Sequence, residues 1–219
     1  MKAVGAALCW GIAVVSAAAQ SSTLPPSQDP IVVQGRIAMV IRQSTNLFDA
    51  GQYDAALKRL DALSGSLAKD PVALNLRGAI LTKLGKFEEA RRIFHEALAA
   101  DPNSLPAAFN LGELDFMQND YPAARAVFQS LLNRDPRNEL LRLKLVACEL
   151  LLGNETGAQG AASALIPAGQ TPAWYYAQAM MAQKKGQPGA AKKYIASARA
   201  IYGADTCKLF DESIAPFDL

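Results

Sequence analysis

Apolar and polar positions along this chain alternate in blocks of helical spacing. From Pro71 onward, apolar or small residues recur three and four positions apart over two stretches, and the pattern breaks at Gly85. This spacing predicts two amphipathic helices joined by a tight turn. The positions that define the pattern are Leu74, Gly78, Leu81, Phe87, Ala90, Phe94 and Ala97.

The same block recurs along most of the chain. Five alanines follow one another at intervals of 34, 34, 34 and 33 residues, and each lies five residues after a glycine or an asparagine. Such a period indicates a stacked helix-turn-helix array, in which each unit buries its apolar face against its neighbours. We therefore expect function on an extended surface. The alanines are Ala56, Ala90, Ala124, Ala158 and Ala191.

The eighth position of each unit is predicted to lie where two helix backbones cross closely. A large side chain there would push the helices apart, and four of the five units carry a small residue. Val146 in the fourth unit is larger than this rule allows. The five residues are Ser44, Gly78, Gly112, Val146 and Ala179.

These positions resemble those of tetratricopeptide-repeat proteins over residues 37–205. The two middle units carry the resemblance best, through Gly78, Ala90, Phe94, Ala97 and Pro102, and through Leu111, Gly112, Ala124, Phe128 and Pro136. The resemblance implies an all-α fold, a right-handed α-solenoid of about five tetratricopeptide helix-turn-helix repeats with a short C-terminal capping segment. The expected repeats lie near 37–70, 71–104, 105–138, 139–171 and 172–205, and residues 206–219 form the cap or tail.

Some positions depart from the family pattern. Gln43 and Ala68 replace the leucine and proline that the family prefers, and Asp115 and Glu149 stand where it prefers a tyrosine. A buried unpaired carboxylate costs several kcal/mol. We therefore expect either arginine partners for the two carboxylates or a locally rotated register.

The first residues differ in kind from the array. Lys2 precedes an apolar run, and small residues follow up to Ala19, which is typical of a cleaved leader. We expect residues 1–19 to be a signal peptide, 20–33 a flexible linker and 34–205 the repeat array. The expected location is outside the cytoplasm, periplasmic or extracellular, with an uncleaved N-terminal membrane anchor as the alternative because the apolar run is short for a span.

Cysteine usage gives little support to a metal site or a disulfide. Cys9 lies in the expected leader, which leaves Cys148 and Cys207. Their positions in the repeats predict a separation too large for a bridge, unless the tail folds back over the array. We expect a buried core thiol at Cys148 and an exposed or capping thiol at Cys207. No paired spacing favours a metal.

Catalysis and nucleic-acid binding are not supported either. His95 is the single histidine and has no serine or cysteine in local register to activate. Adjacent carboxylates such as Glu88 and Glu89 point about 100° apart on a helix and cannot act on one bond together. No glycine-rich phosphate loop is present, and the net charge is +2. We expect no enzymatic activity, no cofactor and no nucleic-acid partner.

The resemblance implies that the first helix of each repeat lines a concave surface, which receives a peptide or helix of a partner protein. In the C-terminal half this lining is apolar with a polar rim, as in protein-binding surfaces. The predicted groove residues are Phe109, Glu113, Phe116, Met117, Leu143, Leu150, Tyr176 and Met180.

Two functions are compatible with this groove. The first is a scaffold or assembly factor that binds a partner segment in the groove. The second is a structural or regulatory accessory subunit of a cell-envelope complex, bound through its outer helices, whose groove is occupied by its own tail. Family members that clamp a C-terminal carboxylate use lysine and asparagine, and Ile41 and Thr45 supply neither here, although Asn110 and Lys144 resemble remnants of the clamp.

Overall fold

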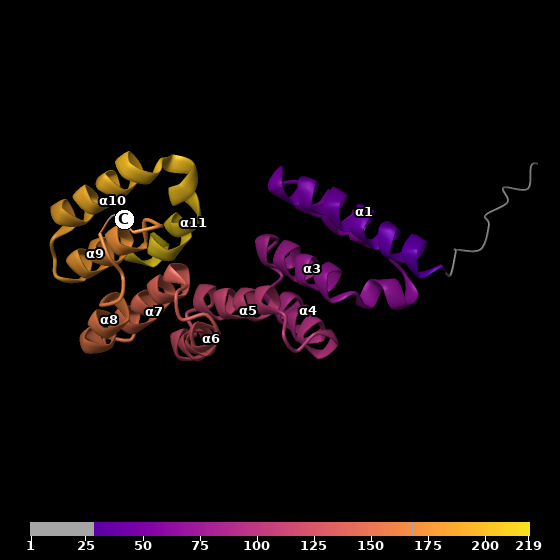
Figure 1. The fold of residues 1–219 in the computed structure, drawn as a ribbon, viewed down its shortest axis with the longest axis horizontal. Coiled ribbons are helices and arrows are strands. Elements are labelled where there is room, and N and C mark those ends of the chain that lie inside the picture. Colours follow the sequence, from indigo (N-terminus) through magenta and orange to yellow (C-terminus); the bar gives the residue numbers. More distant parts are fainter. Residues whose placement is uncertain (1–28, 168) are drawn as a thin grey trace, which may run out of the picture.

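The computed structural model describes residues 29–167 and 169–219, and in these residues the fold is all-helical. Ten helices form five antiparallel pairs that follow the predicted repeats, and an eleventh helix follows them. Figure 1 shows that the pairs build a curved array, with α1 in one arm and α11 in the other. The predicted α-solenoid is confirmed. Its elements are α1 (Pro30–Asp49), α2 (Tyr53–Leu60), η1 (Gly65–Lys69), α3 (Pro71–Lys83), α4 (Phe87–Ala100), α5 (Leu105–Met117), α6 (Tyr121–Arg134), α7 (Glu139–Leu151), α8 (Glu155–Ala162), α9 (Ala173–Lys184), α10 (Pro188–Tyr202), α11 (Ala204–Ile214) and η2 (Ala215–Phe217).

The turn inside each pair has one left-handed residue, and this explains the recurring glycines. All five turn positions have φ between 62° and 77°, a region that L-residues other than glycine and asparagine rarely adopt. The third repeat uses asparagine, the residue after glycine that best tolerates this conformation. The five residues are Gly51, Gly85, Asn119, Gly153 and Gly186.

Close packing within each pair depends on two facing positions of complementary volume. A Cβ added to Gly78 would lie 2.4 Å from the Phe94 ring, so the second repeat combines a glycine with a phenylalanine. The fourth repeat inverts this combination, because Val146 stands at the eighth position and Ala162 where the other repeats carry larger residues. Val146 is therefore accommodated by the small residue on α8.

The helix starts follow from capping side chains. Asp70 accepts hydrogen bonds from the backbone N–H groups of Val72 and Ala73, and Pro71 is the first residue of α3. Such a side-chain cap satisfies donors that the helix itself leaves unpaired. Asp29 and Pro30 repeat this arrangement, so α1 begins at Pro30. The predicted linker over 20–33 is thus wrong for residues 30–33, which are helical, and its part before residue 29 lies outside the described residues, as does the expected signal peptide.

The two carboxylates at the tyrosine position do find arginine partners. Arg91 on α4 binds the buried Asp115 on α5 at 2.5 Å, and Arg125 on α6 lies 3.5 Å from Glu149 on α7. Both arginines occupy the same place in consecutive repeats. Arginine pairing, the first of the two expected alternatives, is therefore confirmed, and it is one repeated inter-repeat contact.

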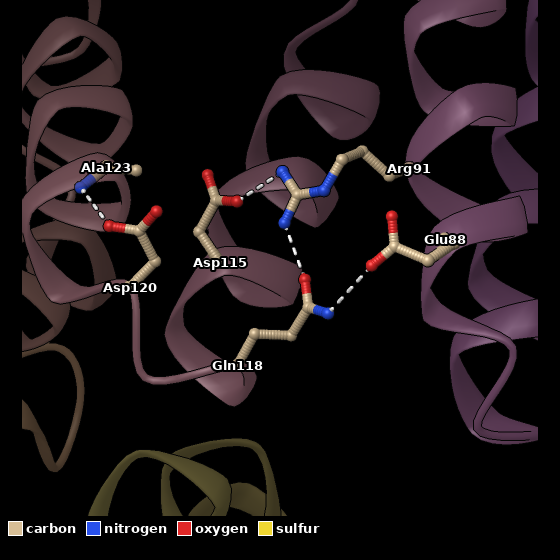
Figure 2. A network of polar contacts seen from close by, with 6 residues as sticks. All are labelled: Glu88, Arg91, Asp115, Gln118, Asp120 and Ala123. Atoms are coloured by element: carbon tan, nitrogen blue, oxygen red, sulfur yellow. Dashed lines mark hydrogen bonds and ion pairs between the residues drawn. The ribbon is translucent and has the colours of Figure 1, made fainter.

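Figure 2 shows how the Arg91 contact extends into a network. The second guanidinium nitrogen donates to the side-chain oxygen of Gln118 at 2.6 Å, and the Gln118 amide lies 3.4 Å from Glu88. Arg91 therefore satisfies Asp115 and orients Gln118 at the end of α5. This network joins α4 to α5 across the repeat boundary.

Both cysteines of the array are free and buried. The prediction of a buried core thiol at Cys148 is confirmed. Burial raises the pKa of Cys148 from 9.0 to about 12, and nearby Lys144 opposes that rise. Cys207 lies on α11 and is fully covered, so it belongs to the capping helix.

The tail packs against the last repeat and also reaches beyond it. Helix α11 contacts α9 and α10, as expected of a cap, and it also contacts α7 of the fourth repeat. Its buried residues are Cys207, Phe210, Ser213 and Ile214, and Phe217 on η2 is also buried. Among the described helices, none combines the length and apolarity needed to cross a bilayer.

Candidate functional site

The concave surface of the array is divided into an open part and a covered part. The open part, here called the central groove, has a volume of about 200 Å³ and lies between α1, α3, α5, α7 and α11. Phe48 at the end of α1 and Leu209 on α11 both line it, so residues far apart in sequence face the same space. The lining residues are Phe48, Ala79, Thr82, Lys83, Phe94, Phe109, Asn110, Glu113, Met117, Leu140, Lys144 and Leu209.

A second cavity of about 290 Å³ adjoins the central groove near the ends of α5, α6 and α7. The two share Phe109, Asn110 and Leu140, so an extended ligand could run from one into the other. We call this cavity the edge pocket. Its other lining residues are Leu105, Pro106, Leu131, Asp135, Asn138 and Leu141.

The predicted groove residues separate into two sets. Phe109, Glu113 and Met117 line the central groove, and the Met117 side chain is 50% exposed. The other five are at most 5% exposed, so the prediction that they line an open surface is wrong. These five are Phe116, Leu143, Leu150, Tyr176 and Met180.

Contacts with the tail and within a repeat explain why these residues are covered. The Tyr176 ring lies 5.7 Å from the Phe210 ring of α11, and the Phe116 ring packs edge-on against Tyr121 at 5.5 Å. Helix α11 contacts both α7 and α9, the helices that carry the other covered residues. The sequence places a residue within its repeat but does not reveal which segment lies over it.

The charges of the groove are partly neutralised within it. Lys144 is 2% exposed, binds Glu113 at 2.7 Å, and lies 5.3 Å from the centre of the Phe116 ring. Asn110 donates its amide to the side-chain oxygen of Asn75 at 2.9 Å. Both polar groups that resembled a carboxylate clamp are therefore engaged within the protein.

Leu209 was missed by the sequence-based site prediction, whereas Leu140 is one of the expected lining positions of the fourth repeat. Leu140 lies at the second position of the fourth repeat and lines both cavities, whereas Leu209 is 58% exposed on α11. The sequence feature that could have indicated Leu209 is its position on the polar side of the amphipathic tail, where a leucine does not contribute to the buried face.

Other chemistry is weakly represented. His95 is exposed on α4, as expected for a surface histidine. Residues 29–167 and 169–219 contain no group of three or more histidine, cysteine or acidic side chains that could hold a metal ion.

Known proteins resemble the chain over part or most of its length. The bovine (Bos taurus) peptidyl-prolyl cis-trans isomerase FKBP4 is 28% identical over 116 residues, which are 53% of this chain and 25% of that protein. Hsp70-Hsp90 organizing protein 2 of Arabidopsis thaliana is 27% identical over 99 residues, 45% of this chain and 17% of that protein. The chain thus spans a quarter or less of these curated relatives.

Solved structures share the fold. A tetratricopeptide repeat protein from Parabacteroides merdae superposes with a TM-score of 0.64 at 17% identity, covering 84% of this chain and 74% of that chain. A thermophilic repeat protein from Thermus thermophilus gives 0.64 at 22% identity, covering 84% and 100%. MamA from Desulfovibrio magneticus gives 0.61 at 17% identity, covering 75% and 94%.

Family models show the membership directly. The description "Tetratricopeptide repeat" applies to matches over residues 41–104, 81–139 and 115–181. Together these matches cover more than half of the chain, and they extend from α1 into α9. This protein belongs to the tetratricopeptide-repeat family.

Proposed function

We propose that this chain is a non-enzymatic scaffold or assembly factor that binds a segment of a partner protein in the central groove. The observation that carries the proposal is the groove itself, whose lining comes from four successive repeats and the tail. Phe48, Phe109, Met117 and Leu209 contribute exposed or half-buried apolar surface to it. Methionine and aromatic side chains adapt well to the shape of a bound segment.

The family supports an interaction role in general, and the lining supports a segment with apolar side chains. Because Lys144 is already bound to Glu113, recognition of a terminal carboxylate by this lysine is not part of the proposal. The relatives named for Hsp70, Hsp90 and prolyl isomerisation match this chain over a quarter or less of their own length. Their activities are therefore not carried over.

A photo-crosslinking amino acid placed at position 117 tests the proposal. We expect a protein adduct from Met117 in cells of the source organism, and we expect Phe109→Asp to abolish it without loss of helical content. Gln129 on the outer helix α6 is exposed and provides the matched control position. No adduct at 117, or an adduct insensitive to Phe109→Asp, would refute groove binding.

The tail favours the accessory-subunit function as the second candidate. Helix α11 contacts α7 and α9, the first helices of the last two repeats, and this supports a tail that takes up part of the concave face and a partner that binds the outer helices. In that case the crosslinker at 129 forms the adduct and the crosslinker at 117 does not. For either function we propose a location outside the cytoplasm, based on the leader-like residues 1–19, and N-terminal sequencing of the mature protein tests it.

A further inference from the structure

The concave surface continues beneath the tail. Leu143 and Ala147 on α7, and Tyr176 and Met180 on α9, occupy the repeat positions that Phe109 and Glu113 hold in the third repeat, where both line the central groove. All four are buried; helix α11 contacts both α7 and α9, and Tyr176 touches Phe210 and Asp211 of α11 directly. The tail therefore already shows what this surface accepts, namely one face of an amphipathic helix.

A small polar contact holds the tail in place. Tyr176 donates its hydroxyl hydrogen to a carboxylate oxygen of Asp211 at 2.5 Å, and Arg199 on α10 binds the same oxygen at 3.2 Å. The Arg199–Asp211 pair is largely exposed, with side-chain exposures of 53% and 36%. Exposed pairs stabilise weakly. The Arg199–Asp211 pair thus adds little, and the tail is held by its apolar face and by the hydrogen bond from the buried Tyr176.

The connection between α10 and α11 is a single glycine in a conformation that other residues rarely adopt. Gly203 alone joins the two helices, with φ of 81° and ψ of 157°, a conformation that is essentially restricted to glycine. A Cβ at this position would meet nothing within 4 Å. A change to alanine would therefore act on the backbone conformation of the hinge and not on packing.

The tail is also an imperfect occupant of the surface. The Ser213 hydroxyl is fully buried, and among the described residues it has no hydrogen-bond partner. A buried polar group without a partner weakens binding compared with an apolar group of the same shape. A helix with an apolar residue at this position would bind the same surface more tightly.

We propose that the surface under α11 is a docking site for an amphipathic helix of another protein, and that α11 is its displaceable internal occupant. This inference rests on the proposed scaffold function and specifies the partner. The partner helix carries apolar residues at the spacing of Phe210, Ile214 and Phe217, an acidic residue corresponding to Asp211, and an apolar residue corresponding to Ser213.

A second copy of this chain is a weaker competitor for the site. Its tail carries the same buried serine hydroxyl, so it gains nothing over the resident tail. The resident tail has in addition the high effective concentration of a tethered segment. Displacement therefore requires a helix that fits better, which favours a different protein.

The test uses the full chain and fluorescent peptides of residues 204–219, with binding measured by fluorescence anisotropy. The peptide with Ser213→Ala should bind about ten-fold more tightly than the unchanged peptide. A peptide with Thr206→Ala, changed at an exposed site, controls for helix propensity and should differ from the unchanged peptide by no more than about two-fold.

Protein variants test the hinge. Gly203→Ala should raise the open fraction and so strengthen peptide binding about ten-fold or more. Gly189→Ala is the matched control, since its Cβ also meets nothing within 4 Å and its backbone is not left-handed. Circular dichroism confirms that both variants keep their helices.

The site of binding separates this inference from the proposed function. A photoreactive residue at the Phe217 position of the peptide should crosslink to α9 or α7, and Met117→Asp should leave peptide binding unchanged. The proposal of a displaceable tail would be overturned if Gly203→Ala and the unchanged chain bound the peptide equally, or if the peptide crosslinked to α1 and α3. Neither result would bear on binding in the central groove, which the crosslinker at position 117 tests. Dimers of Gly203→Ala in light scattering, formed by tail exchange, would overturn the assignment to another protein.

Discussion

Replacing both members of the Arg91–Asp115 pair by leucine should preserve or increase stability, although removing the arginine alone should be severely destabilising. The reason is burial, since the Asp115 side chain is 5% exposed and its arginine partner lies 2.5 Å away. With Arg91→Leu, the carboxylate stays buried without its cation, which costs about 3–5 kcal/mol. Removing both charges avoids this penalty and is expected to be neutral or stabilising by about 1–4 kcal/mol.

The array itself provides a precedent for the leucine pair. Leu57 and Leu81 occupy the corresponding positions one repeat earlier, and they pack together in the same apolar cluster. The backbone geometry of this site therefore accepts two leucines. Asp115→Leu alone should have a smaller effect, about 1 kcal/mol, because Arg91 is 31% exposed and can reach solvent.

Urea unfolding followed by circular dichroism measures these changes, and an unchanged m-value shows that stability alone has shifted. The control is Arg92→Leu, which breaks an exposed pair with Glu96 on the same helix and should cost about 0.5 kcal/mol or less. The reasoning is refuted if Arg91→Leu costs no more than Arg92→Leu, or if the double variant is as unstable as Arg91→Leu.

Three further predictions concern the core. Gly78→Ala should cost about 1–3 kcal/mol, because the new Cβ lies 2.4 Å from a ring carbon of the facing phenylalanine. Gly35→Ala, whose Cβ lies in open space, should instead stabilise α1 by about 0.5–1 kcal/mol. Equal urea midpoints for the two variants would contradict the close approach at Gly78. Ala162→Phe should lower the free energy of unfolding by about 1–3 kcal/mol through overpacking. Adding Val146→Gly should recover most of that loss, because it restores the glycine–phenylalanine combination of the middle repeats. A double variant no more stable than Ala162→Phe would argue against complementary volumes. The folded-state pKa of Cys148 is raised from 9.0 to about 12, so the thiol of the unfolded chain ionises first as the pH rises. The free energy of unfolding should therefore be unaffected by this group below pH 9 and fall on the order of 4 kcal/mol by pH 12. The same fall in Cys148→Ala would assign it to other groups.

Repetition explains how far the sequence predicts this fold. Each turn and facing alanine occurs five times and the small position four times, and local geometry alone determines what each requires. Gly85 and Asn119 need a left-handed backbone wherever the next repeat lies. Even the carboxylate at Asp115 was predictable as a group that needs a cation, although only the packing of α4 against α5 identifies Arg91.

The site was harder to predict because exposure depends on a segment outside the repeats. Tyr176 and Met180 occupy groove positions, but α11 returns over them. The sequence predicted a cap or a groove-filling tail over residues 206–219, and it did not decide between the two surfaces. The direction of the chain after Gly203 is set by a single backbone conformation.

The composition of the concave face, compared between repeats, carries a clearer signal than any one repeat does. Groove positions are mixed in the second repeat, which has Asn75 and Thr82, and uniformly apolar in the fourth, which has Leu143 and Leu150. A contiguous apolar surface left open would favour aggregation, so the most apolar part of such a groove is the part that needs a cover. When the same chain carries an amphipathic helix outside the repeats, we predict that this helix covers the most apolar part of the groove. The part with mixed apolar and polar residues is then the better candidate for an open binding site.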